Sequence, residues 1–310
     1  NNKLDYNDLM DGQKGKEEFV FTLKNDWAFK RLLGAEENKP ILQDFLSCIL
    51  DIPLAEFEDC VLLDKELKKD AKEDKSGILD IQICLKNGTR IDMEMQFIWD
   101  DTFILRSIFY IAKMYTEDFP SGTPYSELHK CISINIVGKG YNVDDEIHSK
   151  YLLMNPKTQH ILTDALQVHF LNLEKIREVP ISLEDTRENH LNNWLKYINA
   201  ENQKERDMLA RSSPVLKILN EKVCKLNLSP EEKRLYESRM KLKSDIVSVC
   251  ESHFNKGIEK GIEKGIEKGA HAKAIETARN CLNLNMPIKT IEQITGLTQD
   301  EIEKLTLSTQ

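Results

Sequence analysis

The twenty-residue segment at positions 78–97 constrains the fold of this chain more than any other. It reads ILDIQICL, then Lys-Asn-Gly, then TRIDMEMQF. Both arms alternate apolar and polar residues, and an Asn-Gly pair between such arms is a strong signal of a hairpin. The segment therefore predicts two antiparallel strands that turn one apolar face toward a core.

The register of this hairpin follows from the positions of its apolar residues. They stand at odd numbers in both arms, so paired residues must have numbers with an even sum if both arms face one core. A two-residue Asn-Gly turn gives a sum of 175 and is excluded. A three-residue loop with Gly88 in the left-handed conformation gives 174. Asp80 then lies opposite Glu94, with Cβ atoms about 4.5–5.5 Å apart, whereas a sum of 176 leaves the two acids diagonal, about 7–8 Å apart.

Two carboxylates at such a distance repel each other. Solvation, protonation of one acid or a shared divalent cation relieves the repulsion. Mg²⁺ takes oxygen ligands, keeps several waters and can activate one of them while bracing a phosphate oxygen. The pair therefore indicates either a metal site or a wetted face of an antiparallel sheet.

Composition narrows the class of protein. The chain has 310 residues, of which 40% are hydrophobic and 31% charged, and its net charge is −9. These values suit a globular chain of one large or two unequal domains. The acidic balance argues against a polybasic nucleic-acid binder but not against an enzyme whose carboxylates hold a metal ion.

The cysteines and the apolar runs indicate the cellular compartment. Seven cysteines without a C-x-x-C pair indicate reduced thiols. No apolar run approaches the ~18 residues that a membrane span requires. We therefore expect a cytoplasmic protein without a membrane partner.

Changes in composition and periodicity along the chain predict four regions. We expect a flexible lead-in over 1–18, a core over 19–180 and a helical region over 181–254. The last region, 255–310, combines a helix made of Lys-Gly-Ile-Glu repeats with a small tail that resembles a helix-turn-helix.

Several motifs together resemble a known family. Asp80, followed after the hairpin by Glu94-Met95-Gln96, resembles the D…(D/E)-x-K core of the PD-(D/E)XK nuclease superfamily. More narrowly, the chain is similar to the recombination-promoting nuclease/putative transposase family of bacteria. The agreement extends over about 19–175 and includes the stretches 25–30, 77–81, 91–96, 106–110 and 125–134. A Lys-Gly-Ile-Glu repeat near the C-terminus is also characteristic of the family.

This resemblance implies an α/β fold, a restriction-endonuclease-like mixed sheet flanked by helices and followed by an α-helical C-terminal region. It also implies a bacterial, cytoplasmic DNA endonuclease that depends on Mg²⁺ or Mn²⁺. Asp80 and Glu94 would be metal ligands, joined by the carbonyl of Met95. Asp26 in the first helix would supplement them, although a helix cap explains an acid at that position equally well.

Gln96 departs from the superfamily pattern, which usually has lysine here. Lysine offers a positive charge to the attacking water and the developing phosphorane, whereas glutamine offers only a dipole. Members of this family commonly have glutamine at this position, so loss of activity does not follow from it. Because the positive charge is missing, we expect activity that is low or strongly metal-dependent. In that reaction Gln96 would orient the water.

The helix expected over 102–118 carries a polar stripe. Arg106, Tyr110 and Lys113 follow each other at spacings of four and three residues, which places them on one side. They can contact a DNA backbone, and a solvated helical face explains the same pattern.

The C-terminal repeat predicts a helix that depends on packing. Its four glycines cost ~1 kcal/mol each relative to alanine, and the isoleucines between them form a slowly winding stripe. The segment after the repeat, 288–305, has two lysines and four acidic residues, and this negative balance is unfavourable for binding phosphate. We expect a packing module here, with a homodimer through the C-terminal helices as one arrangement.

The leading hypothesis is thus a metal-dependent endonuclease that hydrolyses phosphodiester bonds in DNA, with recombination as the process that the family implies. The alternative is a catalytically inactive relative that acts as a DNA- or protein-binding module.

Overall fold

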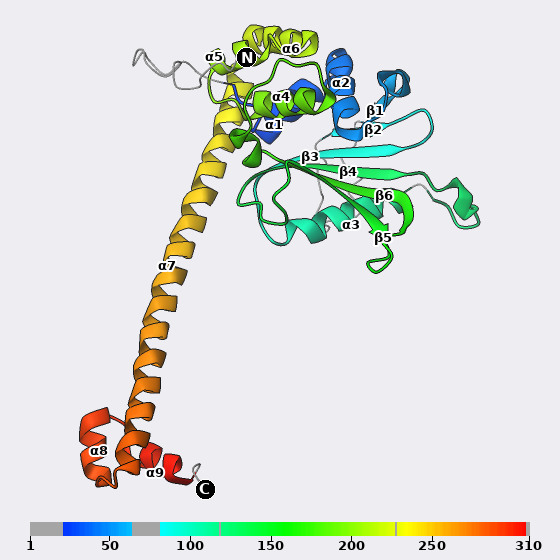
Figure 1. Ribbon diagram of the computed structural model, residues 1–310. Coiled ribbons are helices and arrows are strands. Elements are labelled where there is room, and N and C mark those ends of the chain that lie inside the picture. The colour runs from blue at the N-terminus through cyan, green and yellow to red at the C-terminus, as the bar shows by residue number, and fades with distance from the viewer. Residues whose placement is uncertain (1–20, 64–80, 118, 227, 308–310) are drawn as a thin grey trace. The chain divides into compact units, whose positions relative to one another are not determined.

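The computed structural model describes residues 21–63, 81–117, 119–226 and 228–307 (Figure 1). The chain divides into two compact units, Asn1–Lys241 and Leu242–Gln310. The predicted boundaries at 18, 180 and 254 stay predictions.

The first unit is built on a mixed sheet, as predicted. Its described strands have the order β1-β2-β3-β4-β6-β5. The central pairs β3·β4 and β4·β6 are parallel, and the other neighbours are antiparallel. The strands are β1 (Val61–Leu63), β2 (Ile81–Cys84), β3 (Arg90–Ile98), β4 (Cys131–Lys139), β5 (His148–Met154) and β6 (Ile161–Asn172).

The hairpin of β2 and β3 has the predicted register. Ile81 pairs with Met93 and Ile83 with Ile91, so the paired numbers sum to 174. Gly88 has φ +83°, and its N–H donates to the carbonyl of Leu85 at 2.9 Å. The three-residue loop is therefore confirmed. Asp80 lies outside the described residues, so its pairing with Glu94 stays a prediction.

One face of the sheet packs against helices from both ends of the first unit. Figure 1 shows α1 (Asp26–Leu33), α2 (Lys39–Leu50) and α4 (Arg187–Asn199) on this side. Ile81 and Ile83 of β2 and Ile91, Met93 and Met95 of β3 are buried on this side, as the alternation predicts. The helices α5 (Gln203–Leu209) and α6 (Pro214–Lys225) extend the same hydrophobic core.

Local sequence explains where these helices begin. The side chain of Asn25 caps α1 by accepting from the N–H of Ala28 at 3.1 Å, so Asn25 rather than Asp26 is the cap. Pro40 lies in the first turn of α2 and Pro214 in that of α6, where no backbone N–H is needed. Between α2 and α4, the indole of Trp194 donates to Asp44 at 2.7 Å.

The helix α3 (Phe103–Thr116) covers the opposite face of the sheet (Figure 1). Its Ser107 hydroxyl lies 3.1 Å from the Asn135 side chain on β4, and Phe103 packs with Val137 and Phe170. Asp92 on this face is only 3% exposed. The face of β3 is therefore not wetted at Asp92, whereas the alternative of a wetted face at the pair Asp80 and Glu94 stays a prediction.

The second unit consists of the end of a long helix and two short ones. The helix α7 (Pro230–Asn283) begins in the first unit and runs without a break through the glycine repeat. The helices α8 (Ile288–Thr295) and α9 (Gln299–Leu307) follow, with Gly296 at φ +70° between them. Ile291, Leu297 and Ile302 form a small core with the end of α7.

Short 3₁₀ helices cover Glu36–Asn38, Leu54–Phe57, Tyr125–Glu127 and Lys175–Glu178. None of the helices in the described parts of the chain combines the length and the apolar character that a membrane span needs.

Candidate active site

The strand β3 carries two of the predicted site residues on one face. Glu94 and Gln96 are two positions apart, so they project to the same side, toward α3. Met95 between them is buried in the core on the other side. The parallel neighbours of the two site residues on β4 are Asn135 and Val137. The local alternation of β3 therefore holds both side chains over the central strands of the sheet.

Arg106 of α3 joins these two side chains. Its Nη2 donates to Oε1 of Glu94 at 2.7 Å and to Oε1 of Gln96 at 2.8 Å. The guanidinium carbon lies 4.5 Å from the centre of the Phe103 ring, one helical turn earlier. Because α3 begins soon after β3 and returns across the same face, Arg106 reaches back to the strand. The polar stripe on this helix predicted that Arg106 faces a DNA backbone or solvent, and no sequence pattern indicated its contact with Glu94 and Gln96.

The amide of Gln96 is held at both ends. Its carbonyl oxygen accepts from Arg106, and its Nε2 donates to the carbonyl of Ile98 at 2.6 Å. The two contacts fix the orientation of the amide. A role for Gln96 in orienting water stays a prediction. The Nε2 group has a second hydrogen besides the one donated to Ile98, and this hydrogen can donate to a water molecule.

The electrostatics of the site centre on Glu94. Burial raises the pKa of this carboxyl above its usual value, and the charge and hydrogen bond of Arg106 partly oppose the increase. The pKa of Tyr110, one turn beyond Arg106, is also raised by burial and by the charges of Glu94 and Asp92, while Arg106 lowers it. Tyr110 therefore shares the electrostatic environment of Glu94.

The site remains accessible to solvent. The side chain of Glu94 is 15% exposed and that of Arg106 is 36% exposed. A carboxylate in such a position is partly desolvated but can still meet an ion or a phosphate.

The other predicted residues lie outside this cluster. Asp26 is the first residue of α1, and its Oδ2 forms an ion pair with Arg239 of α7 at 2.5 Å. Lys113 is exposed on α3, and Tyr110 is half-buried. Asp80 lies outside the described residues. The structure thus brings Glu94, Gln96 and Arg106 together, with Tyr110 one turn away.

The donors present agree with a hard divalent cation but do not complete a site. The Glu94 carboxylate offers oxygen ligands, which Mg²⁺ and Mn²⁺ prefer. Among the described residues, no group of three or more His, Cys, Asp and Glu side chains could hold a metal ion. The predicted metal site needs Asp80 as its second carboxylate, and Asp80 lies outside the described residues.

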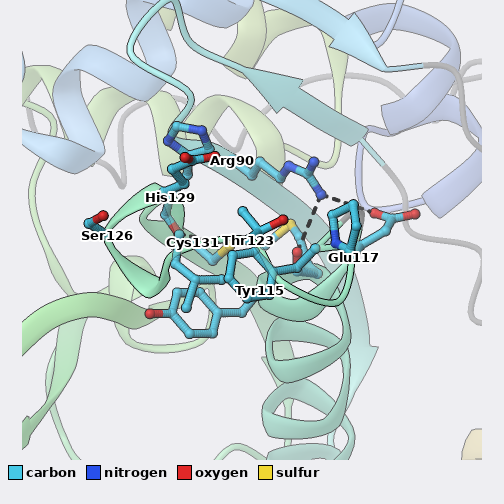
Figure 2. Close-up of a pocket in the computed structure, with 12 residues that line it drawn as sticks. Arg90, Tyr115, Glu117, Thr123, Ser126, His129 and Cys131 are labelled. Carbon is cyan, nitrogen blue, oxygen red and sulfur yellow. Dashed lines mark hydrogen bonds and ion pairs between the residues drawn. The ribbon is translucent and has the colours of Figure 1, made fainter.

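A separate pocket of about 720 Å³ lies where β3 and β4 begin and α3 ends (Figure 2). Arg90 in its wall donates from Nη1 to the carbonyl of Met114 and pairs with Oε2 of Glu117, both at 3.3 Å. Burial raises the pKa of the Cys131 thiol in the pocket to about 11, so this thiol stays protonated at neutral pH. Arg90 is four residues before Glu94, about 13 Å along the strand. The pocket is therefore not part of the cluster around Arg106, and no sequence motif predicted it.

Comparison with known proteins bears on the chemistry of the cluster. A family model described as PD-(D/E)XK nuclease family transposase matches residues 23–253, about three quarters of the chain. Searches of the curated proteins and of the solved structures found no match.

Proposed function

Because the chain belongs to the PD-(D/E)XK nuclease family of transposases, we propose that it is a metal-dependent endonuclease that hydrolyses phosphodiester bonds in DNA. The observation that carries the proposal is the partly desolvated carboxylate of Glu94 on a central strand, with a raised pKa and a bound arginine beside it. Such a carboxylate, next to a cation, suits binding of a metal ion and of a phosphate.

In this proposal Asp80 and Glu94 hold the ion, Mg²⁺ or Mn²⁺. The bound ion would supply the positive charge that polarises a phosphate oxygen and makes water acidic. Support for the pair comes from the neighbouring residues. Ile81 pairs with Met93 in antiparallel strands. Asp80 directly precedes Ile81, and Glu94 directly follows Met93.

Asp26 is a further proposed acid. Its ion pair with Arg239 has to open before the carboxylate can take part in metal binding. The DNA backbone would approach along α3, where Tyr110 and Lys113 lie beyond Arg106. We place the reaction in the bacterial cytoplasm, without a membrane partner, and in the promotion of recombination.

The second proposed partner is another copy of this chain, bound through α7. All residues from 251 to 270 are exposed, including Ile258, Ile262 and Ile266 of the repeat. Most of the stability of a helix in a protein comes from packing, and the glycines of the repeat weaken this one further. A second copy would supply the missing packing.

The geometry of the repeat favours a crossing of two helices rather than an extended coiled coil. Glycines and isoleucines form adjacent stripes, and the lysines and glutamates occupy the other side. A repeat of four residues winds about 40° per repeat, so two copies can keep these stripes in contact only over a few turns.

Plasmid cleavage tests the proposed activity. Wild-type protein with Mg²⁺ or Mn²⁺ is expected to cleave DNA, and Asp80→Ala and Glu94→Ala are expected to abolish cleavage. Asp101→Asn, which changes an exposed acid just beyond β3, is the matched control and should cleave like the wild type. Equal cleavage by both site variants would eliminate the site. Folded wild-type protein that binds DNA without cleaving it would favour the alternative of an inactive binding module.

A further inference from the structure

We propose that Arg106 is itself a catalytic residue, which exchanges the Glu94 carboxylate for the scissile phosphate when a divalent cation binds to Glu94. This inference rests on the proposed function. In it, the positive charge that lysine usually supplies at position 96 comes instead from the helix after the strand.

The position of the guanidinium supports this role. A single nitrogen, Nη2, contacts two acceptors that stand side by side on β3, Glu94 and Gln96. The positive charge therefore lies beside Glu94, the predicted metal ligand. The Phe103 ring beneath the guanidinium limits its movement to the side.

An unsatisfied donor points toward a further ligand. Nε of Arg106 is buried, and no acceptor for it exists among the described residues. Leaving a buried donor of a charged group without an acceptor is costly. A phosphate oxygen is the acceptor that Nε and a terminal nitrogen of arginine bind best as a pair. Turning the guanidinium away from Glu94 would let it make this contact.

The exchange follows from charge. Glu94 would hold a divalent cation through the carboxylate oxygen that Arg106 now contacts, so Arg106 would lose this partner. A phosphate of the DNA would then be the anion that Arg106 binds. In the absence of metal, Arg106 instead neutralises a carboxylate that burial disfavours as an anion.

This arrangement also explains the glutamine at position 96. The Gln96 oxygen accepts from Arg106 at 2.8 Å, and an ammonium group from lysine at this position would place two like charges side by side. A neutral acceptor is compatible with the arginine, and it is held in the accepting orientation by the carbonyl of Ile98. Gln96 is therefore a positioning residue for Arg106.

The test combines Mn²⁺ binding by calorimetry with plasmid cleavage. In Arg106→Gln the metal no longer competes with a guanidinium, so we expect Mn²⁺ to bind several-fold to tenfold more tightly. Cleavage should nevertheless fall by about 10²–10³-fold, the usual effect of losing one transition-state donor. A residue with only a structural role would not strengthen metal binding and weaken cleavage at once.

Two further variants test the same assignment. Arg106→Lys keeps a charge and should retain an intermediate rate. Adding Gln96→Lys to Arg106→Gln should recover part of the cleavage, because the charge returns to the site from the strand. Lys113→Gln, an exposed cation on the same helix, is the control and should leave Mn²⁺ affinity unchanged.

The outcomes separate this inference from the proposed function. Loss of both Mn²⁺ binding and cleavage in Glu94→Gln supports the site, whatever Arg106 does. If Arg106→Gln cleaves like the wild type, or binds Mn²⁺ more weakly while its thermal stability is unchanged, the role of Arg106 is wrong even though the nuclease assignment stands. Wild-type protein that neither binds Mn²⁺ nor cleaves DNA overturns both.

Discussion

The guanidinium of Arg106 and the side-chain carbonyl of Gln96 form a hydrogen bond of 2.8 Å between α3 and β3. The same nitrogen contacts Glu94, so the helix and the strand meet at the proposed catalytic carboxylate. The packing of α3 on the sheet therefore places the positive charge of Arg106 beside the Glu94 carboxylate.

Gln96→Lys alone should destabilise the protein. The new ammonium group would lie beside the Arg106 guanidinium in a partly buried site, and we expect a loss of about 1–3 kcal/mol in the free energy of unfolding. Urea denaturation measures the effect. Made in the Arg106→Gln background, the same substitution should cost much less, and equal losses in both backgrounds would show that the two positions are not coupled.

The hairpin loop requires glycine at position 88 for two reasons. Its φ of +83° disfavours a side chain, and an added Cβ would lie 2.3 Å from Nδ1 of His129. Gly88→Ala should therefore lower the free energy of unfolding by about 2–3 kcal/mol. Gly122→Ala is the matched control, because Gly122 has φ +94° with nothing near its Cβ position, and it should cost only about 1 kcal/mol. Similar losses for the two variants would rule out the contact with His129.

Two histidines of the sheet should make the fold sensitive to acid. Nε2 of His148 on β5 lies 2.9 Å from Nδ1 of His169 on β6, and burial, together with nearby Lys150, lowers the pKa of the former to about 4 and of the latter to about 3. Arg187 also lowers the pKa of His148. Both rings are therefore neutral in the folded protein, while the unfolded chain takes up protons below about pH 6.5.

Stability contributed by these neutral rings is complete above pH 6.5 and is lost as the pH falls toward 4. The slope can reach about 1.4 kcal/mol per pH unit for each histidine. Urea denaturation at pH 7, 6 and 5 measures it, and His169→Gln should make the dependence shallower. A variant with the wild-type slope would contradict this assignment.

The exposed isoleucines of α7 should decide the oligomeric state. Replacing Ile258, Ile262 and Ile266 with glutamine is expected to convert a dimer into monomers, because it removes the apolar stripe of the repeat. Sedimentation equilibrium measures the change. The control replaces Glu259, Glu263 and Glu267 on the other side with glutamine and should leave the dimer intact. A wild-type protein that is monomeric at high concentration would exclude the dimer.

Much of the fold could be predicted because local patterns determine it. The parity of apolar residues in the hairpin requires the register that places Ile81 opposite Met93, and the structure has this register. The edge strand β5 was not predicted. Its sequence, HSKYLLM, alternates poorly, and its pairing with β6 shifts register near Leu153. The glycine repeat suggested a weak helix, yet α7 continues through it.

The candidate site could be predicted only in part. Glu94 and Gln96 follow from the strand pattern and the motif, because both depend on neighbours in the sequence. The role of Arg106 depends on how α3 returns across the sheet, which no local pattern determines. The burial of Glu94 has the same origin, since α3 covers the face that a simple hairpin would leave in solvent.

Soaking a crystal in Mn²⁺ shows directly whether Arg106 gives up Glu94 to a metal ion. We expect an anomalous peak within coordination distance of carboxylate oxygens of Asp80 and Glu94, with the guanidinium of Arg106 withdrawn from Glu94. An Arg106 that keeps its contact with Glu94, in a site that takes up no manganese at millimolar concentration, would contradict it.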